Sequence, residues 1–251
     1  MPDIGMVPDF LASERYNIIR NILKQPRETM KTKKLVKACK KVPLSIEKLI
    51  TRKMAFGEKE ALVLDDIFKK NELEGLYEVI RTMPYEWRNS DEAKNDYSTR
   101  WASFISTKEA LKHTQLRRII DLVYAIYPDL ELKLERVYVN FNLYGEIHFP
   151  HFDDGRLTAL FYVNKEWESE WQGETFFYEN EEPVQVVAPK PNRLLLFDAS
   201  ILHRGSPPSR ECYEPRLNIA FKFSSGHSQV KKVKKSNAGK EKIEVVRKKA
   251  A

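Results

Sequence analysis

The sequence predicts an α+β domain in which a few helices support an antiparallel β-sandwich or barrel. Two observations carry this prediction: amphipathic helical patterns precede Pro128, and short β-rich runs follow it. Glycine, proline, asparagine and aspartate separate these runs, as is typical of strands joined by turns. A block of helices followed by a block of strands favours helices packed against an antiparallel sheet.

Residues 8–56 read as a helical segment. Apolar residues recur there at mixed three- and four-residue steps, and Ser45 is the expected N-cap of a helix over IEKLITRKMAF. The stretch KTKKLVKACKK within this segment is strongly basic. It has two interpretations, the solvated face of a docked helix or a helix that binds a partner or nucleic acid.

A second unit begins near Glu60. The run ALVLDDIF is expected to form a first strand that leads into a helix. The segments NELEGLYEVIRTMP and STKEALKHTQLRRIIDLVYAIYP are amphipathic, and a proline ends each of them. The expected strands that follow are VYVNFNLYG, LTALFYVN, GETFFYE, PVQVVAP, NRLLLFDA and LNIAFKF.

The charge is unevenly distributed over these parts. The formal net charge is +7, yet residues 227–251 alone hold nine Lys/Arg and two Glu. Residues 20–60 hold thirteen Lys/Arg and four Glu, so the body at 61–226 is mildly acidic. We therefore predict a basic helical extension over 1–60, one folded domain over 61–226 and a disordered Lys-rich tail over 227–251. A basic isoelectric point is typical of nucleic-acid binding. Here the excess of basic residues lies in segments 20–60 and 227–251, so any nucleic acid would be expected to bind there.

Composition excludes several classes of protein. No apolar run reaches the ~18 residues that span a bilayer, and the N-terminus lacks the basic and apolar regions of a signal peptide. We therefore expect no membrane partner and a cytoplasmic location. Cys39 and Cys212 lie far apart, which predicts reduced thiols and neither a disulfide framework nor a CxxC metal site.

Three residues in the strand-rich region form a candidate metal site. His151 and Asp153 are two positions apart, so on an extended strand both side chains point to one face. His203 follows the predicted strand NRLLLFDA and supplies a third ligand if the fold returns that strand end to the same place. Two imidazoles and one carboxylate leave open positions on a metal, as non-haem Fe(II) oxygenases require.

Other interpretations of the histidines remain open. A zinc hydrolase also uses three ligands around one water, and a zinc-bearing cupin or a non-enzymatic jelly-roll binding protein could keep the same residues. His148 lies close to His151 but has no acid two residues on, which favours an entrance or packing role. His113 and His227 are predicted to lie away from the site.

On these residues the chain resembles the prolyl-4-hydroxylase-like branch of the Fe(II)/2-oxoglutarate oxygenases. The resemblance covers about residues 61–223 and is densest in HFDDGRLTALFYVNKEWESEWQGETFFY and PKPNRLLLFDASILHRG. It implies a double-stranded β-helix, a jelly-roll fold, with supporting N-terminal helices. It also implies Fe(II), 2-oxoglutarate and O₂, with ascorbate as a further cofactor.

Site residues follow from the resemblance position by position. His151, Asp153 and His203 match the iron ligands. Arg216 matches the residue that grips the distal carboxylate of 2-oxoglutarate, for which its planar fork is suited. Three more residues match positions that line or contact the 2-oxoglutarate pocket of the family, namely Tyr144, Tyr162 and Thr158. The other interpretation of the two tyrosines is aromatic packing in the core.

Two intervals depart from the family pattern. The stretch from Tyr144 to His151 is short, and SPPSRECYEP lengthens the stretch from His203 to Arg216. Arg204 and Arg210 lie nearby and are alternative anchors. Arg216 is favoured because a strand follows it directly, with side chains that alternate into a barrel interior.

The resemblance implies hydroxylation of an unactivated C–H with release of succinate and CO₂. The expected substrate is a prolyl or other side chain in a protein or peptide, or a free amino acid; another small metabolite remains an alternative. A nucleic-acid demethylase of the AlkB type is a further alternative, because NLY at 142–144 and RLNIAFK at 216–222 resemble motifs of that family. Substrate identity and oligomeric state stay open.

Overall fold

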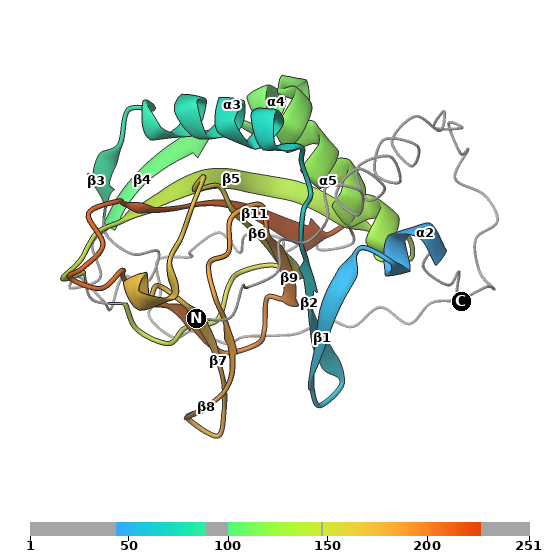
Figure 1. The fold of residues 1–251 in the computed structure, drawn as a ribbon. Coiled ribbons are helices and arrows are strands. Elements are labelled where there is room, and N and C mark those ends of the chain that lie inside the picture. Colours follow the sequence, from blue (N-terminus) through green and yellow to red (C-terminus); the bar gives the residue numbers. More distant parts are fainter. Residues whose placement is uncertain (1–43, 89–99, 147, 227–251) are drawn as a thin grey trace, which may run out of the picture.

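The computed structural model describes residues 44–88, 100–146 and 148–226. The helices predicted before residue 44 and the disorder predicted for 227–251 lie outside the described residues. Figure 1 shows a layered arrangement in which α3 and α5 lie across one face of a large sheet, while β7 and β8 lie on the opposite side. The helix-backed antiparallel fold that the sequence predicts is therefore confirmed.

The described strands form two sheets, both with antiparallel pairing. The larger has eight strands in the order β1-β2-β9-β6-β11-β5-β4-β3, and the smaller has the order β10-β7-β8. The strands are β1 (Ile50–Phe56), β2 (Lys59–Leu64), β3 (Glu86–Arg88), β4 (Arg100–Ile105), β5 (Leu132–Asn142), β6 (Leu157–Tyr162), β7 (Thr175–Glu179), β8 (Glu182–Val187), β9 (Leu194–Asp198), β10 (His203–Gly205) and β11 (Arg216–Ser225).

The described helices are short and amphipathic. They are α2 (Leu44–Glu47), α3 (Lys70–Arg81), α4 (Thr107–Lys112) and α5 (Thr114–Ile126), with a 3₁₀ turn at Ser169–Trp171. The single helix predicted over STKEALKHTQLRRIIDLVYAIYP is divided at His113, whose ψ of 124° is extended. Ser106 caps α4 in a capping box with Glu109, which fixes the start of this helix.

The helix predicted after Ser45 is wrong beyond Glu47. Residues Ile50–Phe56 form β1, which pairs with β2 through a hairpin whose turn contains Gly57 at φ +60°. Met54 and Phe56 point into the core between the two sheets, so their burial favours the extended form over the helical propensity of the segment. The large sheet thus begins before residue 61, and the predicted boundary there divides a hairpin.

Two clusters of buried side chains hold the layers together. One joins α3 and α5 to the large sheet, with Leu76, Ile119 and Phe221 among its members. The other fills the space between the sheets, where Phe177 packs at 5.3 Å between ring centroids from Phe197. Sheet-on-sheet packing of this kind positions the small sheet, and with it β10, over the middle strands of the large one.

The pair Asp65–Arg193 gives a stability prediction that is independent of function. Arg193 donates to both carboxylate oxygens of Asp65, at 2.7 and 3.0 Å, where β2 ends and β9 begins. Arg193→Met leaves the buried Asp65 carboxylate without its main partner and is expected to lower the free energy of unfolding by about 3 kcal/mol. Urea denaturation at pH 7 measures this, with the exposed Lys133→Met as a control that should change little.

The same pair predicts how the stability of the fold changes at acidic pH. Burial raises the pKa of the Asp65 carboxyl, but the bonds from Arg193 outweigh it and the net shift is downward. The stabilisation is therefore present above about pH 4, where an unfolded aspartate is ionised, and is lost as the pH falls through the lower folded value. Wild type should lose more stability than Arg193→Met between pH 5 and pH 2; parallel losses would contradict the assignment.

Candidate metal centre

Backbone pairing brings the two histidines together. The amide of His151 donates to the carbonyl of His203 at 2.9 Å, and the amide of His203 donates back at 3.0 Å. This isolated antiparallel bridge joins the loop before β6 to the first residue of β10. The two imidazole rings lie 4.5 Å apart between centroids, so the fold meets the condition on which His203 could be a third ligand.

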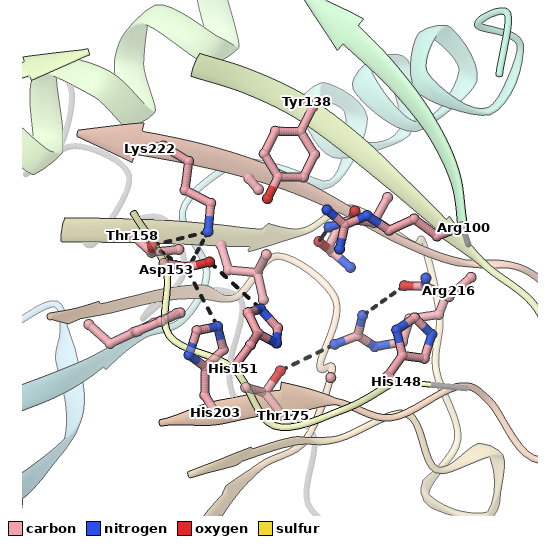
Figure 2. Close-up of a pocket in the computed structure, with 17 residues that line it drawn as sticks. Arg100, Tyr138, His148, His151, Asp153, Thr158, Thr175, His203, Arg216 and Lys222 are labelled. Atoms are coloured by element: carbon pink, nitrogen blue, oxygen red, sulfur yellow. Dashed lines mark hydrogen bonds and ion pairs between the residues drawn. The ribbon is translucent and has the colours of Figure 1, made fainter. Parts of the chain in front are cut away.

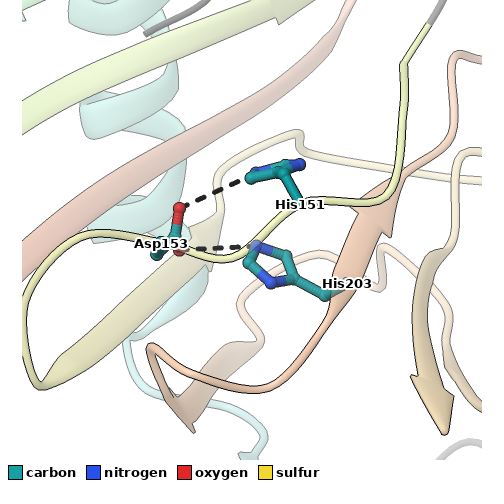
Figure 3. A group of neighbouring side chains, drawn as sticks. All are labelled: His151, Asp153 and His203. Atoms are coloured by element: carbon teal, nitrogen blue, oxygen red, sulfur yellow. Dashed lines mark ion pairs between the residues drawn. The ribbon is translucent and has the colours of Figure 1, made fainter. Parts of the chain in front are cut away.

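Asp153 completes the group. Its amide donates to the carbonyl of Ala199 at 2.9 Å, which ties the loop to the end of β9. His151 Nε2 lies 3.7 Å from Asp153 Oδ1, and His203 Nε2 lies 3.4 Å from Asp153 Oδ2. Ligand atoms of the three residues all lie within 4.8 Å of one another (Figure 3). They form a candidate metal site of two imidazoles and one carboxylate.

Hydrogen bonds orient both imidazoles for metal binding. His151 Nδ1 lies 3.0 Å from the carbonyl of Phe149, and His203 Nδ1 lies 2.9 Å from the carbonyl of Ile201. A carbonyl accepts only, so each Nδ1 carries the proton and donates. The Nε2 lone pairs are left for an ion, which is the second-shell pattern of metal-binding histidines.

The protonation states also suit a metal ion. Burial, with the neighbouring His203, lowers the pKa of His151 to about 4, so its imidazole is neutral at pH 7. Burial raises the pKa of the Asp153 carboxyl, but the Lys222 ammonium outweighs it and holds that pKa well below its usual range. A neutral imidazole and an ionised carboxylate are the forms that bind a divalent cation.

Thr158 and Lys222 both contact the Asp153 carboxylate. Thr158 Oγ1 donates to Asp153 Oδ2 at 2.6 Å, and Lys222 Nζ forms an ion pair with the same oxygen. The structure thus places Thr158 beside the candidate metal ligand and on the wall of the same cavity, and its co-substrate contact stays a prediction. Lys222 was not predicted as a site residue, although alternation along RLNIAFK puts it on the same face as Arg216.

Arg216 lies buried at the start of β11 and lines the same cavity. Its guanidinium donates to the carbonyl of Gly173 at 2.5 Å, to Asn142 Oδ1 at 3.2 Å and to Thr175 Oγ1 at 3.2 Å. Burial lowers the pKa of this guanidinium. Its hydrogen-bond partners among the described residues are neutral, and Glu174 and Glu146 act on it only through longer-range charge attraction. A buried cation with only neutral partners is suited to an anionic ligand.

Gly173 has a steric reason to be glycine. Its φ is +84°, and a Cβ at this position would lie 2.9 Å from Arg216 Cδ. A larger residue would therefore displace the arginine side chain as well as strain the backbone. The QGETFF turn that resembles the oxygenases thus makes room for Arg216.

The two predicted tyrosines take different positions. Tyr162 is buried, its hydroxyl lies 2.8 Å from Thr175 Oγ1, and its ring lies 5.3 Å from Arg216 Cζ. It supports the Arg216 end of the cavity from behind. Tyr144 is 63% exposed and does not line the cavity, so the structure does not support its predicted contact with a co-substrate.

One cavity connects the candidate metal site with Arg216. Its empty space is about 530 Å³, part of it open to solvent. Figure 2 shows the imidazoles, Asp153 and Lys222 at one end, with Arg216 and His148 at the other. The residues that line it are Arg100, Tyr138, Asn140, Asn142, His148, His151, Asp153, Thr158, Leu160, Thr175, Phe197, His203, Gly205, Arg216, Asn218, Ala220 and Lys222.

An asparagine pair forms part of the cavity floor between β5 and β11. Asn140 Nδ2 donates to Asn218 Oδ1 at 2.9 Å, which leaves Asn140 Oδ1 and Asn218 Nδ2 buried without a partner. If both amides are turned over, the pair still leaves one donor and one acceptor. Neither residue was predicted, although Asn218 shares the alternating face of β11 with Arg216.

Comparison with known proteins supports this description. Residues 139–224 match the family model described as the 2OG-Fe(II) oxygenase superfamily. No curated protein matches the sequence. None of the helices in the described part of the chain has the length and apolar character needed to cross a bilayer.

Solved structures resemble the chain in fold. A prolyl-4-hydroxylase from Pseudomonas putida matches with a TM-score of 0.54 at 18% identity, over 65% of this chain and 92% of that one. A prolyl hydroxylase from Trichoplax adhaerens, solved with a peptide fragment of the hypoxia inducible factor oxygen degradation domain, has a TM-score of 0.52 at 18% identity, with 66% and 83% covered. SnoN, an alpha-ketoglutarate-dependent epimerase from nogalamycin biosynthesis, has a TM-score of 0.52 at 14% identity, with 73% and 84% covered.

The fold and the matched segment agree with each other. The described residues form the double-stranded β-helix that the resemblance implies. The matched segment contains His151, Asp153, His203 and Arg216, which come from separate strands and loops and meet at one cavity. Residues 139–224, which supply most of the cavity lining, therefore match the 2OG-Fe(II) oxygenase superfamily in sequence, and the solved structures above share the fold.

Proposed function

We propose that this chain is a hydroxylase that uses Fe(II), 2-oxoglutarate and O₂ to oxidise an unactivated C–H of a protein side chain or an amino acid. The observation that carries the proposal is that the candidate metal site and the buried Arg216 open into one cavity. A dicarboxylate that binds a metal at one end needs a cation at the other. Arg216 occupies that position, with neutral hydrogen-bond partners around it.

Each residue has a distinct task in this proposal. His151, Asp153 and His203 hold Fe(II), which together with 2-oxoglutarate and O₂ supplies the oxidising chemistry when bound. Arg216 binds the distal carboxylate, and Asn142 and Thr175 keep its guanidinium in place. Burial of these groups limits water, so the charge contacts are stronger than they would be in solution.

The substrate assignment rests on the cavity walls. The Asn140–Asn218 pair offers one donor and one acceptor, which matches the N–H and C=O of an amide. Phe149 and Phe152 flank His151 and are 42% and 60% exposed. Exposed aromatic side chains beside a reactive site favour a peptide or protein over a fully enclosed metabolite. The two prolyl hydroxylases of similar fold agree with this class of substrate.

Tyr162→Phe tests the Arg216 end of the cavity with a small change. The variant loses the hydroxyl that lies 2.8 Å from Thr175 Oγ1, and Thr175 in turn accepts a hydrogen bond from Arg216. A hydrogen bond contributes about 1 kcal/mol, so the 2-oxoglutarate requirement should rise about fivefold. Initial rates against 2-oxoglutarate concentration measure this requirement. Tyr138→Phe removes a hydroxyl from the cavity wall beside Lys222, and it should change the 2-oxoglutarate requirement less than Tyr162→Phe does.

The deciding assay is succinate formation from 2-oxoglutarate with Fe(II) and O₂, with and without candidate substrates. Peptides, free amino acids and alkylated oligonucleotides form the three arms, and peptides are expected to stimulate turnover. Succinate is the better readout than a hydroxylated product because SnoN, of similar fold, is an epimerase. Absence of succinate in every arm, with iron and 2-oxoglutarate bound, would favour a binding protein.

The nucleic-acid alternative depends on the basic segments 20–60 and 227–251, most of which lie outside the described residues. Binding through phosphates weakens steeply with added salt. Stimulation by alkylated oligonucleotides that disappears with salt and on deletion of 227–251 would favour this alternative over peptide hydroxylation.

A further inference from the structure

Lys222 is a buried cation that contacts the candidate metal ligand Asp153. The side chains of Lys222 and Asp153 are 7% and 8% exposed, and their ion pair lies on the cavity side of β11. Lys222 Nζ also donates to Thr158 Oγ1 at 3.2 Å and lies 5.9 Å from the centre of the Tyr138 ring (Figure 2). A lysine ammonium is strongly hydrated and is rarely buried unless it is paired, so its placement against Asp153 is specific to this site.

The two oxygens of Asp153 have unequal surroundings. Oδ2 lies 3.4 Å from His203 Nε2, which has no proton to donate. It accepts a hydrogen bond from Thr158 Oγ1 at 2.6 Å and also contacts Lys222 Nζ. A carboxylate oxygen has about two lone-pair sites, so these two partners saturate Oδ2. Oδ1 faces His151 Nε2 at 3.7 Å and has no hydrogen-bond donor among the described residues. Oδ1 is therefore the oxygen with lone pairs left for an ion.

We propose that Lys222 is a positioning residue that restricts Asp153 to binding a metal ion through Oδ1 alone. The inference rests on the proposed function, since it concerns the iron and 2-oxoglutarate of that reaction. A carboxylate that binds through both oxygens takes one more coordination position than a carboxylate that binds through one. Lys222 and Thr158 together keep that position open for 2-oxoglutarate or O₂.

Removing Lys222 should separate metal binding from co-substrate binding. In Lys222→Met the carboxylate is free to turn and to hold the ion through both oxygens, and one positive charge near the ion is gone. Metal affinity should be equal to wild type or higher. Affinity of the metal-loaded protein for 2-oxoglutarate should fall at least tenfold, because a coordination position and a nearby cation are lost.

Three further variants sharpen the test. Thr158→Val removes the other contact to Oδ2 at constant shape and should shift 2-oxoglutarate affinity in the same direction, by about threefold. Lys222→Arg keeps a cationic donor and should recover most of the wild-type affinity. Lys133→Met makes the same chemical change at a lysine that is 68% exposed, and should behave as wild type.

The experiment uses the full chain, stripped of metal and kept without oxygen. Calorimetry with Co²⁺ measures metal affinity, and a second titration with 2-oxoglutarate measures binding to the Co²⁺-loaded protein. The Co²⁺ absorption spectrum reports a change in coordination number, which a purely structural role would not produce. Circular dichroism shows whether each variant is folded. If Lys222→Met does not fold, the 2-oxoglutarate affinity of Thr158→Val decides the outcome.

The outcomes distinguish this inference from the proposed function. Wild type that binds Co²⁺ but not 2-oxoglutarate contradicts the proposed function and the inference with it. Wild type that binds both, with Lys222→Met and Thr158→Val unchanged in 2-oxoglutarate affinity, overturns only the role of Lys222. Equal losses of Co²⁺ and 2-oxoglutarate affinity in a folded Lys222→Met would also overturn it, since that pattern indicates a damaged site and not a freed carboxylate.

Discussion

Replacing His151 with alanine is expected to abolish 2-oxoglutarate turnover and to weaken binding of a divalent metal by at least about 100-fold. The estimate is a lower bound, because loss of even an outer-shell partner of a metal ligand typically costs 10- to 100-fold. His151 supplies one of the three groups of the candidate site, with its Nε2 directed at Asp153 and its Nδ1 held by the Phe149 carbonyl. Calorimetry with Mn²⁺ and succinate release measure the two effects.

His113→Ala is the matched control for this variant. His113 lies at the junction of α4 and α5, away from the cavity, so metal affinity and turnover should stay at wild-type levels. The loss in His151→Ala should not come with loss of the fold, because the His151–His203 bridge is formed by backbone groups. Wild-type metal affinity in a folded His151→Ala would show that the ion binds elsewhere.

Arg216→Met is expected to raise the 2-oxoglutarate requirement by about 30-fold or more. Charge-assisted hydrogen bonds contribute about 1.5–3 kcal/mol, and about 2 kcal/mol corresponds to a 30-fold change. Metal affinity should change little, because Arg216 lies at the end of the cavity away from Asp153 (Figure 2). Titration of 2-oxoglutarate into the metal-loaded protein separates this loss from any effect on later steps.

Arg204→Met tests the alternative anchor. The guanidinium of Arg204 lies over the rings of Phe176 and Tyr178, and it does not line the cavity. Its replacement should leave 2-oxoglutarate affinity unchanged. Arg216→Lys should give an intermediate loss, because a lysine keeps the charge but not the planar fork. Unchanged kinetics in Arg216→Met, or a loss in Arg204→Met instead, would show that the anchor is misassigned.

Local patterns predicted most elements but not the edges of the large sheet. The runs that became β5, β6, β7, β8, β9 and β11 are rich in β-branched and aromatic residues, and turn residues separate them. The strands β3 and β4 were not predicted, since EWR and RWASFI are short and lack a strong apolar alternation. Their pairing with β5 stabilises them, and a pairing partner is not visible in a local window.

Spacing predicted the metal residues, whereas only the fold revealed their surroundings. The HxD pair places His151 and Asp153 together by local geometry, and that holds in any extended segment. The approach of His203 depends on a bridge between segments fifty residues apart, so it needs tertiary structure. The contacts of Lys222 and Thr158 with Asp153, and the Asn140–Asn218 pair, also arise between strands that are distant in sequence.

By itself the sequence predicted the helix-backed antiparallel fold and the candidate ligands His151, Asp153 and His203, and the family resemblance added Arg216 as the first choice of anchor. Alternation and turn residues act over a few positions, so they can be read without knowing the fold. The tertiary structure decided that residues 50–56 form a strand, that Tyr144 faces solvent and that Lys222 saturates one oxygen of Asp153. Burial and pairing across strands decide these points, because both depend on which distant residues meet.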